Sequence, residues 1–321
     1  MARKSRPLKA TRNMPRTHKN ILEELKKRQT ERKSISQPEI DTQIAVVKDQ
    51  TKKQKEDIQP PKPLCVGTIF PGVSEFNQRW LDLQLKYFRA STSVDFHHVT
   101  FLQQGQASEF FKNNTEIIRS KGPAARNSAA HVKGLEGLKN YFIKNADLYK
   151  HFLFIDMDAF PIHKDWYANL CDKLKTKWEI ATLLRPENLE QRLHSSVLFC
   201  DKRALPRLSW GLRKVGDDLI GKSESDVQIL EYQNARRKQA YVMLRSNQHQ
   251  IHPLLCGVYY DLFYHHGCGS GRNFNMRSKP YWKHVVAQNV DVRKTIDELM
   301  KNPNDFIHEL AGWNNKNYAQ V

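Results

Sequence analysis

The sequence predicts an α/β domain with a mixed, mostly parallel β-sheet that is flanked by helices and preceded by a polar N-terminal segment. Three observations carry this prediction. Apolar runs typical of buried strands alternate along the chain with segments of helical periodicity. The 321 residues are 39% hydrophobic, which is enough to build a sizeable core without disulfide bridges. Residues 1–63 lack this alternation, are polar and are almost without aromatic side chains.

The N-terminal residues 1–63 are expected to be a disordered basic tail and linker, and residues 64–321 one folded domain. The tail ends in the sequence QPPKP, and its composition cannot bury enough apolar surface to offset the entropy lost on ordering. Residues 1–33 hold 12 Lys and Arg against 3 Asp and Glu, so their charge of +9 is half of the net +18. Such a basic block attracts any polyanion, including nucleic acid. It is explained equally by a solvated disordered tail or by a targeting signal, and these interpretations stay open.

The first unit of the folded domain is predicted to be a strand, a helix and a second strand. The apolar run LCVGTIF begins at Leu64 and is ended by Pro71 and Gly72, as expected of a buried strand that enters a loop. Residues 75–88 place large apolar side chains at helical spacing, and residues 94–103 are typical of the next strand. The pattern therefore predicts a β-α-β unit.

The rest of the domain is expected to continue this alternation. Ser128 is positioned to cap a helix that leads to the strand 151–162, which is the strongest strand signal in the sequence. Further strands are expected at 179–184, 195–200 and 240–245, and two helices after Asp291. Alternation of this kind favours a largely parallel sheet.

The strand 151–162 contains the pattern that points to chemistry. Its apolar residues FLFI precede Asp156-Met157-Asp158, so two carboxylates are expected on one side of the chain at the carboxyl end of a buried strand. Open α/β sheets bind ligands at this edge. Unpaired carboxylates would repel each other there, so they require a cation, and Mn²⁺ or Mg²⁺ suits oxygen ligands and can hold a diphosphate. An isolated Asp-x-Asp is also common in solvated turns, and its position after the apolar run favours the metal.

The sequence FLFIDMDAFPI, followed by Trp166, resembles the D-x-D region of GT-A glycosyltransferases. RPEN at 185–188 and HSSVLFCD at 194–201 are similar to the segments that follow it in small soluble members of this family, and FYHHGCGSGR at 263–272 is similar to their histidine segment. The resemblance extends over residues 64–272, about two thirds of the chain. It implies a GT-A-like fold, a nucleotide-sugar donor with a UDP-sugar favoured, a divalent metal and hexosyl or pentosyl transfer.

The resemblance also implies site residues. The metal ligands would be Asp156 and Asp158 with an imidazole from His265 or His266, which remain alternatives. The expected contacts to the donor are Thr68, Phe70, Pro71, Arg126, His131, Met157, Gly267, Gly269 and Arg272. The expected contacts to the sugar or the acceptor are Arg185, Glu187, Asn188, Ser195 and Ser196. Arg126 and His131 lie at the start of a helix, where an anion can bind, and are equally well explained as surface residues.

An acceptor hydroxyl must lose a proton in an inverting transfer, which requires a base. The resemblance places this base at Asp226, at the start of a helix, with Glu224 as the second choice. The sequence SESD before an apolar stretch is also the signature of a helix capping box, in which Asp226 serves only its own helix. Both interpretations stay open.

Together these patterns predict a metal-dependent glycosyltransferase that works in the cytoplasm, or in the host cytoplasm or nucleus if the protein is viral or eukaryotic. The sequence has no apolar run long enough to span a membrane and no recognisable secretory signal. Its five cysteines form no C-x-x-C pair, so reduced thiols are expected rather than disulfides or structural zinc.

The basic charge of the tail and of the domain favours a polyanionic acceptor. DNA with hydroxymethylated pyrimidines, as used by the DNA-hypermodifying transferases of phages and kinetoplastids, fits this charge better than a secreted glycoprotein. A glycan or a cytosolic protein is the alternative acceptor. Two functions of other classes also stay open: a nucleic-acid-binding protein built on an inactive transferase fold, and a nucleotidyltransferase, which also uses paired carboxylates and Mg²⁺ but releases pyrophosphate.

Overall fold

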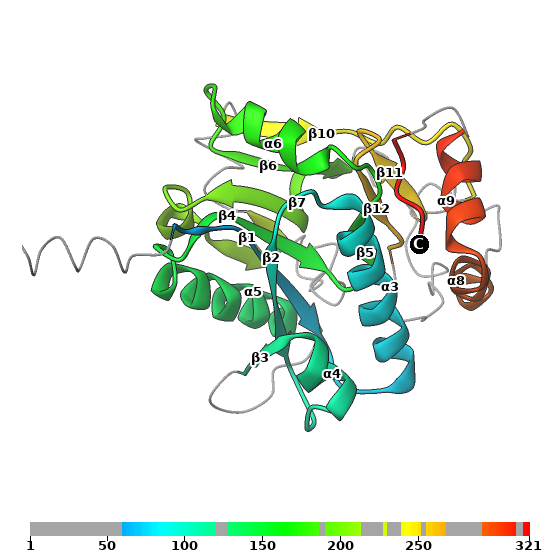
Figure 1. Cartoon of the computed structure of the whole chain (residues 1–321), viewed down its shortest axis with the longest axis horizontal. Helices are drawn as coiled ribbons and strands as arrows, with labels where there is room; N and C mark the ends of the chain where they lie inside the picture. Colours follow the sequence, from blue (N-terminus) through cyan, green and yellow to red (C-terminus); the bar gives the residue numbers. More distant parts are fainter. Residues whose placement is uncertain are drawn as a thin grey trace, which may run out of the picture. The chain divides into compact units, whose positions relative to one another are not determined.

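A computed structural model describes residues 60–119, 127–185, 190–212, 227–229, 239–251, 255–267, 291–312 and 317–321. The fold belongs to the unit Pro61–Val321 (Figure 1). Its first strand begins at Lys62, two residues before the predicted start of the folded domain at Leu64. Residues 1–59 lie outside the described part of the chain, so the expected disorder of the tail stays a prediction.

A mixed β-sheet forms the centre of this unit, with the strand order β10-β6-β7-β4-β1-β2-β3. These strands are β1 (Lys62–Phe70), β2 (Phe96–Leu102), β3 (Glu116–Ile118), β4 (Tyr149–Asp156), β6 (Ile180–Arg185), β7 (Glu190–Asp201) and β10 (Ala240–Met243). β4, β1, β2 and β3 run parallel, and so do β6 and β10, whereas β7 is antiparallel to both β4 and β6. The predicted α/β class with a mixed, mostly parallel sheet is confirmed.

Helices cover both faces of this sheet (Figure 1). The described helices are α3 (Glu75–Ser91), α4 (Glu109–Asn114), α5 (Asn127–Lys144), α6 (Trp166–Leu174), α8 (Val292–Lys301) and α9 (Pro303–Ala311), with a short 3-10 helix at Leu205–Arg207. Alternate residues of β1 point to opposite faces. Cys65 and Ile69 pack in one apolar cluster with α5, and Leu64 and Val66 pack in another with α3 and α6.

The β1-α3-β2 unit shows why the local sequence folds as predicted. The Ser74 hydroxyl accepts a hydrogen bond from the Asn77 N–H and caps the start of α3. Trp80 and Phe88 of α3 are fully buried. On the other face of β1, a Cβ added at Gly67 would lie 2.6 Å from Cζ of Phe142, so glycine is required for the close approach of α5.

A smaller sheet with the strand order β11-β12-β5 lies next to the carboxyl end of β4. Its strands are β5 (Ala159–Pro161), β11 (Gly257–Tyr259) and β12 (Phe263–His265). Two further short strands, β8 (Trp210–Leu212) and β9 (Val227–Ile229), pair with each other, and β9 also pairs with β7. The backbone after β5 pairs with the last described segment, since the Ala319 N–H donates to the carbonyl of Ile162.

Three local predictions need correction. The apolar strand stops at Asp156 as expected, but the strand signal over 151–162 belongs to two strands, because Met157 and Asp158 form a turn and β5 follows. Ser128 is not the N-cap of its helix, because α5 already begins at Asn127. The helix expected to start at Asp226 is not formed by Val227–Ile229, which are strand β9. The β-branched side chains of these residues alternate with Gln228, a pattern of period two that suits a strand.

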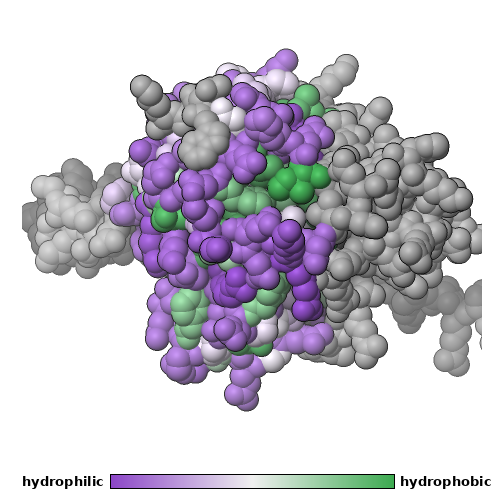
Figure 2. All heavy atoms as spheres, turned by 90° about the vertical axis from the view of Figure 1, so that its right-hand side faces the viewer, coloured by the Kyte–Doolittle hydropathy of each residue, from purple (hydrophilic) through white to green (hydrophobic). Residues whose placement is uncertain are grey.

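Among the described residues, Cys65, Cys171, Cys200 and Cys256 are free, and Cys268 lies outside the described ranges. Within the described ranges, no helix combines the length and the apolar character that crossing a bilayer requires. The face at the right-hand side of Figure 1 is mainly hydrophilic where its residues are described, with separate hydrophobic areas (Figure 2).

Candidate metal centre

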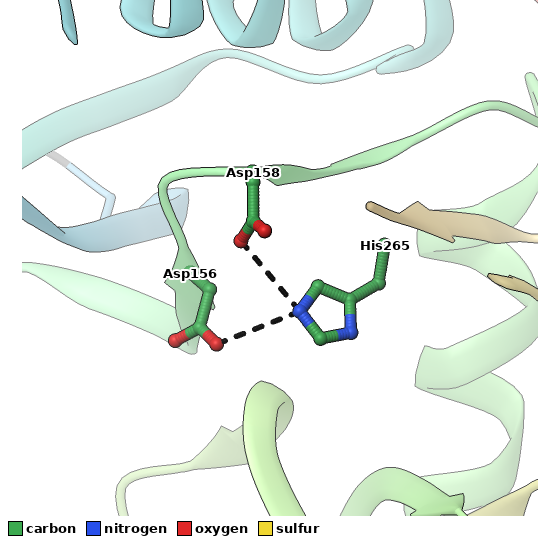
Figure 3. Close-up of side chains that lie close together, drawn as sticks. All are labelled: Asp156, Asp158 and His265. Atoms are coloured by element: carbon green, nitrogen blue, oxygen red, sulfur yellow. Dashed lines mark ion pairs between the residues drawn. The ribbon is translucent and has the colours of Figure 1, made fainter. Parts of the chain in front are cut away.

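Three side chains from distant parts of the sequence meet at the carboxyl end of β4. Asp156 is the last residue of β4, and Asp158 follows in the turn before β5. In the antiparallel pair of β5 and β12, His265 lies opposite Ala159. Nε2 of His265 is 3.7 Å from Oδ2 of Asp156 and 3.6 Å from Oδ1 of Asp158 (Figure 3). The pairing of β5 with β12 therefore brings the imidazole to the two carboxylates.

This Asp-Asp-His group has the composition and the spacing of a metal site. One ligand atom from each residue lies within 4.8 Å of the others, and each residue is at most 6% exposed. A cation stabilises two buried carboxylates whose oxygens lie within 4.8 Å of each other, because burial removes the water that would screen their charges. Carboxylate oxygens with one imidazole nitrogen suit Mn²⁺ or Mg²⁺. The residues present thus fit a divalent ion.

A second imidazole lies on the other side of the Asp156 carboxylate. His131, near the start of α5, is buried and has its Nε2 3.4 Å from Oδ1 of Asp156. The two oxygens of Asp156 therefore face different rings, with Oδ1 toward His131 and Oδ2 toward His265. This arrangement orients Oδ2 toward the metal group.

The side chain of Gln84, from α3, holds the turn that carries the aspartates. Its Nε2 donates to the backbone carbonyls of Asp156, at 2.9 Å, and of Ala159, at 2.7 Å. Its Oε1 accepts from the Thr68 hydroxyl at 3.0 Å and lies 3.2 Å from Nε2 of His98. Burial lowers the pKa of His98 to about 3, so this ring is neutral at ordinary pH. Gln84 thus links both ends of the turn to a buried, uncharged hydrogen-bond network.

The strand ends of β6 and β7 supply polar groups beside the metal group. The ring centroid of His194 is 5.9 Å from that of His265. Burial lowers the pKa of His194 well below its usual range, and the nearby Arg185 guanidinium lowers it further. Arg185, Ser195 and Ser196, three of the residues expected to contact the sugar or the acceptor, are all buried in this region.

The structure separates the roles of the two neighbouring histidines. Nδ1 of His266 is 2.7 Å from the Tyr264 hydroxyl, and its Nε2 is 3.3 Å from Oγ1 of Thr295. Burial lowers the pKa of His266 to about 4. The backbone N–H of His266 donates to the carbonyl of Asp158. His265 therefore joins the metal group, whereas His266 packs in the core and holds the turn through its backbone.

The other residues predicted to contact the nucleotide-sugar donor differ in how far they are exposed to solvent. Thr68 and Phe70 are fully buried in β1, with Thr68 bonded to Gln84 and Phe70 in edge contact with Phe111. Pro71 is exposed. Met157 is buried in the turn, and Gly267 follows β12 with a positive φ of 70°.

Seven predicted site residues lie outside the described part of the chain, so their roles stay predictions: Arg126, Glu187, Asn188, Glu224, Asp226, Gly269 and Arg272.

Sequence reasoning missed two residues at this site, Gln84 and His194. Gln84 lies midway between the buried Trp80 and Phe88, four residues from each, so a polar side chain in the apolar stripe of a helix was the available signal. His194 is the first of three polar residues, His-Ser-Ser, that interrupt the apolar residues of β7 after the buried Leu193. This interruption was the available signal.

No family model and no curated protein matches the sequence. The solved structures that are similar to parts of the chain include the following three. The first is a glycosyltransferase involved in the glycosylation of the major capsid of PBCV-1, at 13% identity over 45% of this chain and a TM-score of 0.31. S. aureus TarS 1–349 is similar at 11% identity over 38% of this chain and a TM-score of 0.27.

The third is the mannosyltransferase PcManGT from Pyrobaculum calidifontis in complex with GDP-Man and Mn²⁺, at 10% identity over 58% of this chain and a TM-score of 0.34. The chain spans 62%, 35% and 59% of these three proteins, which is less than two thirds of each.

Proposed function

We propose that the chain is a metal-dependent glycosyltransferase that takes a sugar from a nucleotide-sugar donor. The observation that carries the proposal is the buried group of Asp156, Asp158 and His265 at the carboxyl end of β4. Ligands bind at this edge of open α/β sheets, and a cation stabilises buried carboxylates there. The D-x-D resemblance of the sequence supports the same function.

The roles of the residues follow from the charge that develops in such a transfer. Breaking the bond between the sugar and the diphosphate builds negative charge on the departing phosphate, and a bound Mn²⁺ or Mg²⁺ supplies positive charge there. Asp156, Asp158 and His265 would hold that ion, and His131 and Gln84 would keep the carboxylate of Asp156 and the turn in place. Arg185, which the sequence assigns to the sugar or the acceptor, is a buried cation that acts on His194, and its charge also suits a phosphate oxygen.

The acceptor proton requires a separate base. We retain Asp226 for this role, with Glu224 as the second choice, on the strength of the sequence resemblance. UDP-sugars are the donors tested first for the same reason, and GDP-sugars are tested beside them.

The test is incubation of the full chain with radiolabelled UDP- and GDP-sugars and Mn²⁺, followed by separation of the nucleotide products. Release of a nucleoside diphosphate from at least one donor is expected, and it should stop with chelator. Asp158→Asn removes one ligand charge with little change in volume and should lower the rate by at least about 100-fold, because transition-state charge loses its stabilisation. Asp172→Asn, which changes an exposed aspartate of α6, is the matched control and should leave the rate unchanged.

Three outcomes would reject the proposal. Activity that is indifferent to chelator would exclude the metal role, and release of pyrophosphate would identify a nucleotidyltransferase. Absence of any nucleotide product together with tight DNA binding would favour an inactive transferase fold that binds nucleic acid.

For the acceptor we propose a polyanion, with DNA that contains hydroxymethylated pyrimidines as the first candidate. Support comes from the net charge of +18 and from the basic residues 1–33. The test compares transfer to hydroxymethylated DNA, unmodified DNA, an anionic glycan and a protein at two salt concentrations. Transfer to the modified DNA that falls steeply with salt is expected, and transfer only to glycan or protein would replace this acceptor. A cytoplasmic location is part of this proposal and rests on the unpaired cysteine pattern.

A further inference from the structure

An irregularity in β7 lies directly beside the metal group. Thr182 of β6 pairs with Leu198, but the next residue of β6, Leu183, pairs with His194, so β7 bulges between these positions. The Thr182 hydroxyl spans the bulge, within hydrogen-bond distance of the carbonyls of His194 at 2.7 Å and Val197 at 2.9 Å. Val197 is in turn paired with Ile155, the neighbour of Asp156. The bulge is therefore fixed in place next to the first metal ligand.

The bulge also determines which nitrogen of His194 carries the hydrogen. Nδ1 of His194 lies 2.8 Å from Oγ of Ser196, and the backbone N–H of Ser196 donates to it at 3.2 Å. The backbone N–H can only donate, whereas the Ser196 hydroxyl can turn to donate or to accept, so Nδ1 acts as an acceptor. In a neutral imidazole the hydrogen then sits on Nε2. The other tautomer would set two N–H groups against each other. With Nδ1 occupied as an acceptor, the ring is uncharged and Nε2–H is a single donor.

Two buried polar groups of the bulge have no hydrogen-bond partner among the described residues. Nε2 of His194 is one, although the residue is only 4% exposed, and Oγ of Ser195, which is 1% exposed, is the other. A buried group left without a partner costs about 1–3 kcal/mol, and native proteins rarely keep such groups without a use. His194 lies against His265 of the metal group. Nε2 of His194 and Oγ of Ser195 are therefore available to a ligand that binds beside the metal group.

We propose that Nε2–H of His194 and Oγ of Ser195 form a subsite for a hydroxyl group of the sugar that is transferred. This inference rests on the proposed glycosyltransferase function. A sugar hydroxyl requires both a hydrogen-bond donor and an acceptor, and the neutral imidazole N–H and the serine oxygen supply one each. The diphosphate carries the negative charge and is matched by the ion and Arg185, whereas an uncharged donor suits an uncharged hydroxyl.

The experiment measures binding in the full chain with Mn²⁺, using UDP, GDP, UDP-glucose and GDP-mannose in calorimetric titrations. His194→Phe keeps a ring and removes both nitrogens. It should lower affinity for the nucleotide sugar that the wild type binds by about 10-fold and leave affinity for the matching nucleoside diphosphate unchanged. His194→Gln, whose amide reaches toward the Nε2 position, should recover most of that loss. Ser195→Ala should weaken the nucleotide sugar alone by a smaller factor.

The matched control is His151→Phe, which changes a histidine at the opposite end of β4 that stacks on Phe199. Its affinities for all four ligands should equal those of the wild type. Two further readouts do not depend on the sugar. Mn²⁺ affinity without nucleotide should be the same in His194→Phe and the wild type, and ¹⁵N spectra of the ligand-free wild type should show His194 protonated at Nε2.

Failure of the sugar subsite and failure of the glycosyltransferase function give different results in these measurements. Equal loss of nucleoside diphosphate and nucleotide sugar in His194→Phe would assign the ring to the phosphates and overturn the sugar subsite. Loss of Mn²⁺ affinity would assign it to the metal, and protonation at Nδ1 or unchanged sugar affinity would also overturn the subsite. A wild type that binds none of the four ligands would reject the glycosyltransferase function, and the subsite with it.

Discussion

Replacement of Gln84 by methionine tests how the metal turn is held. The change keeps a side chain of similar length in the fully buried position and removes every hydrogen bond that the amide makes. The carbonyls of Asp156 and Ala159 lose their donor at 2.9 and 2.7 Å, and the Thr68 hydroxyl loses its acceptor at 3.0 Å. The perturbation therefore acts on the backbone of the turn and leaves the three metal ligands unchanged.

The expected magnitude follows from the bonds lost. A buried acceptor left without its donor costs about 1–3 kcal/mol, so the loss at two carbonyls should lower the free energy of unfolding by about 2–6 kcal/mol. Residues that orient metal ligands typically contribute 10- to 100-fold in metal affinity, and we expect Mn²⁺ affinity to fall by about that factor.

Urea unfolding gives the stability, and titration of Mn²⁺ followed by electron paramagnetic resonance gives the affinity. The control is Asn77→Leu, which breaks a partly buried side-chain bond from α3 to the carbonyl of Gly72, away from the metal turn. It should destabilise the protein by about 1–3 kcal/mol with Mn²⁺ affinity unchanged. If Gln84→Met binds Mn²⁺ as tightly as the wild type does, Gln84 does not position the ligands and the reasoning is wrong.

Three further predictions concern stability. The pKa of His98 is about 3 in the folded protein against about 6.5 when unfolded. The contribution of the neutral ring to the free energy of unfolding is therefore complete above pH 6.5 and is lost as the pH falls toward 3. The free energy of unfolding, measured with urea at pH 7 and at pH 4.5, should fall by about 3 kcal/mol less in His98→Gln than in the wild type. An equal fall in both proteins would mean that the ring of His98 is already charged in the folded protein. Gly67→Ala should lower stability by about 1–3 kcal/mol because the new Cβ would meet Phe142, whereas Gly72→Ala, with its nearest neighbour at 3.7 Å, should be nearly neutral in the same assay. Mn²⁺ at about 100 times its dissociation constant should raise the free energy of unfolding by about 2.7 kcal/mol in thermal melts, with no effect in Asp158→Asn; equal shifts in both would place the ion elsewhere.

Elements with long apolar runs were predictable from the sequence. The strands around Val66 and Phe154 and the helix around Trp80 were all placed correctly, because burial on a sheet or along a helix face produces a local pattern. Short elements such as β3, β11 and β12 were not predicted. Three residues are too few to show a period, and their strand geometry comes from pairing with distant segments.

The candidate site was predictable only in part for the same reason. The two aspartates follow an apolar run, so their position was evident from neighbouring residues. The choice between His265 and His266 was not, because it depends on which ring faces β5 in a pairing between distant strands. The bulge at His194 was equally hidden, since a register shift between β6 and β7 leaves no mark in either strand alone.

The ladder between β5 and β12 also determines when the metal group can exist. His265 follows Asp158 by more than a hundred residues, so both aspartates leave the ribosome well before the imidazole does. At that stage the group consists of two carboxylates. The group of three side chains is complete only when the three backbone pairs of this ladder have formed.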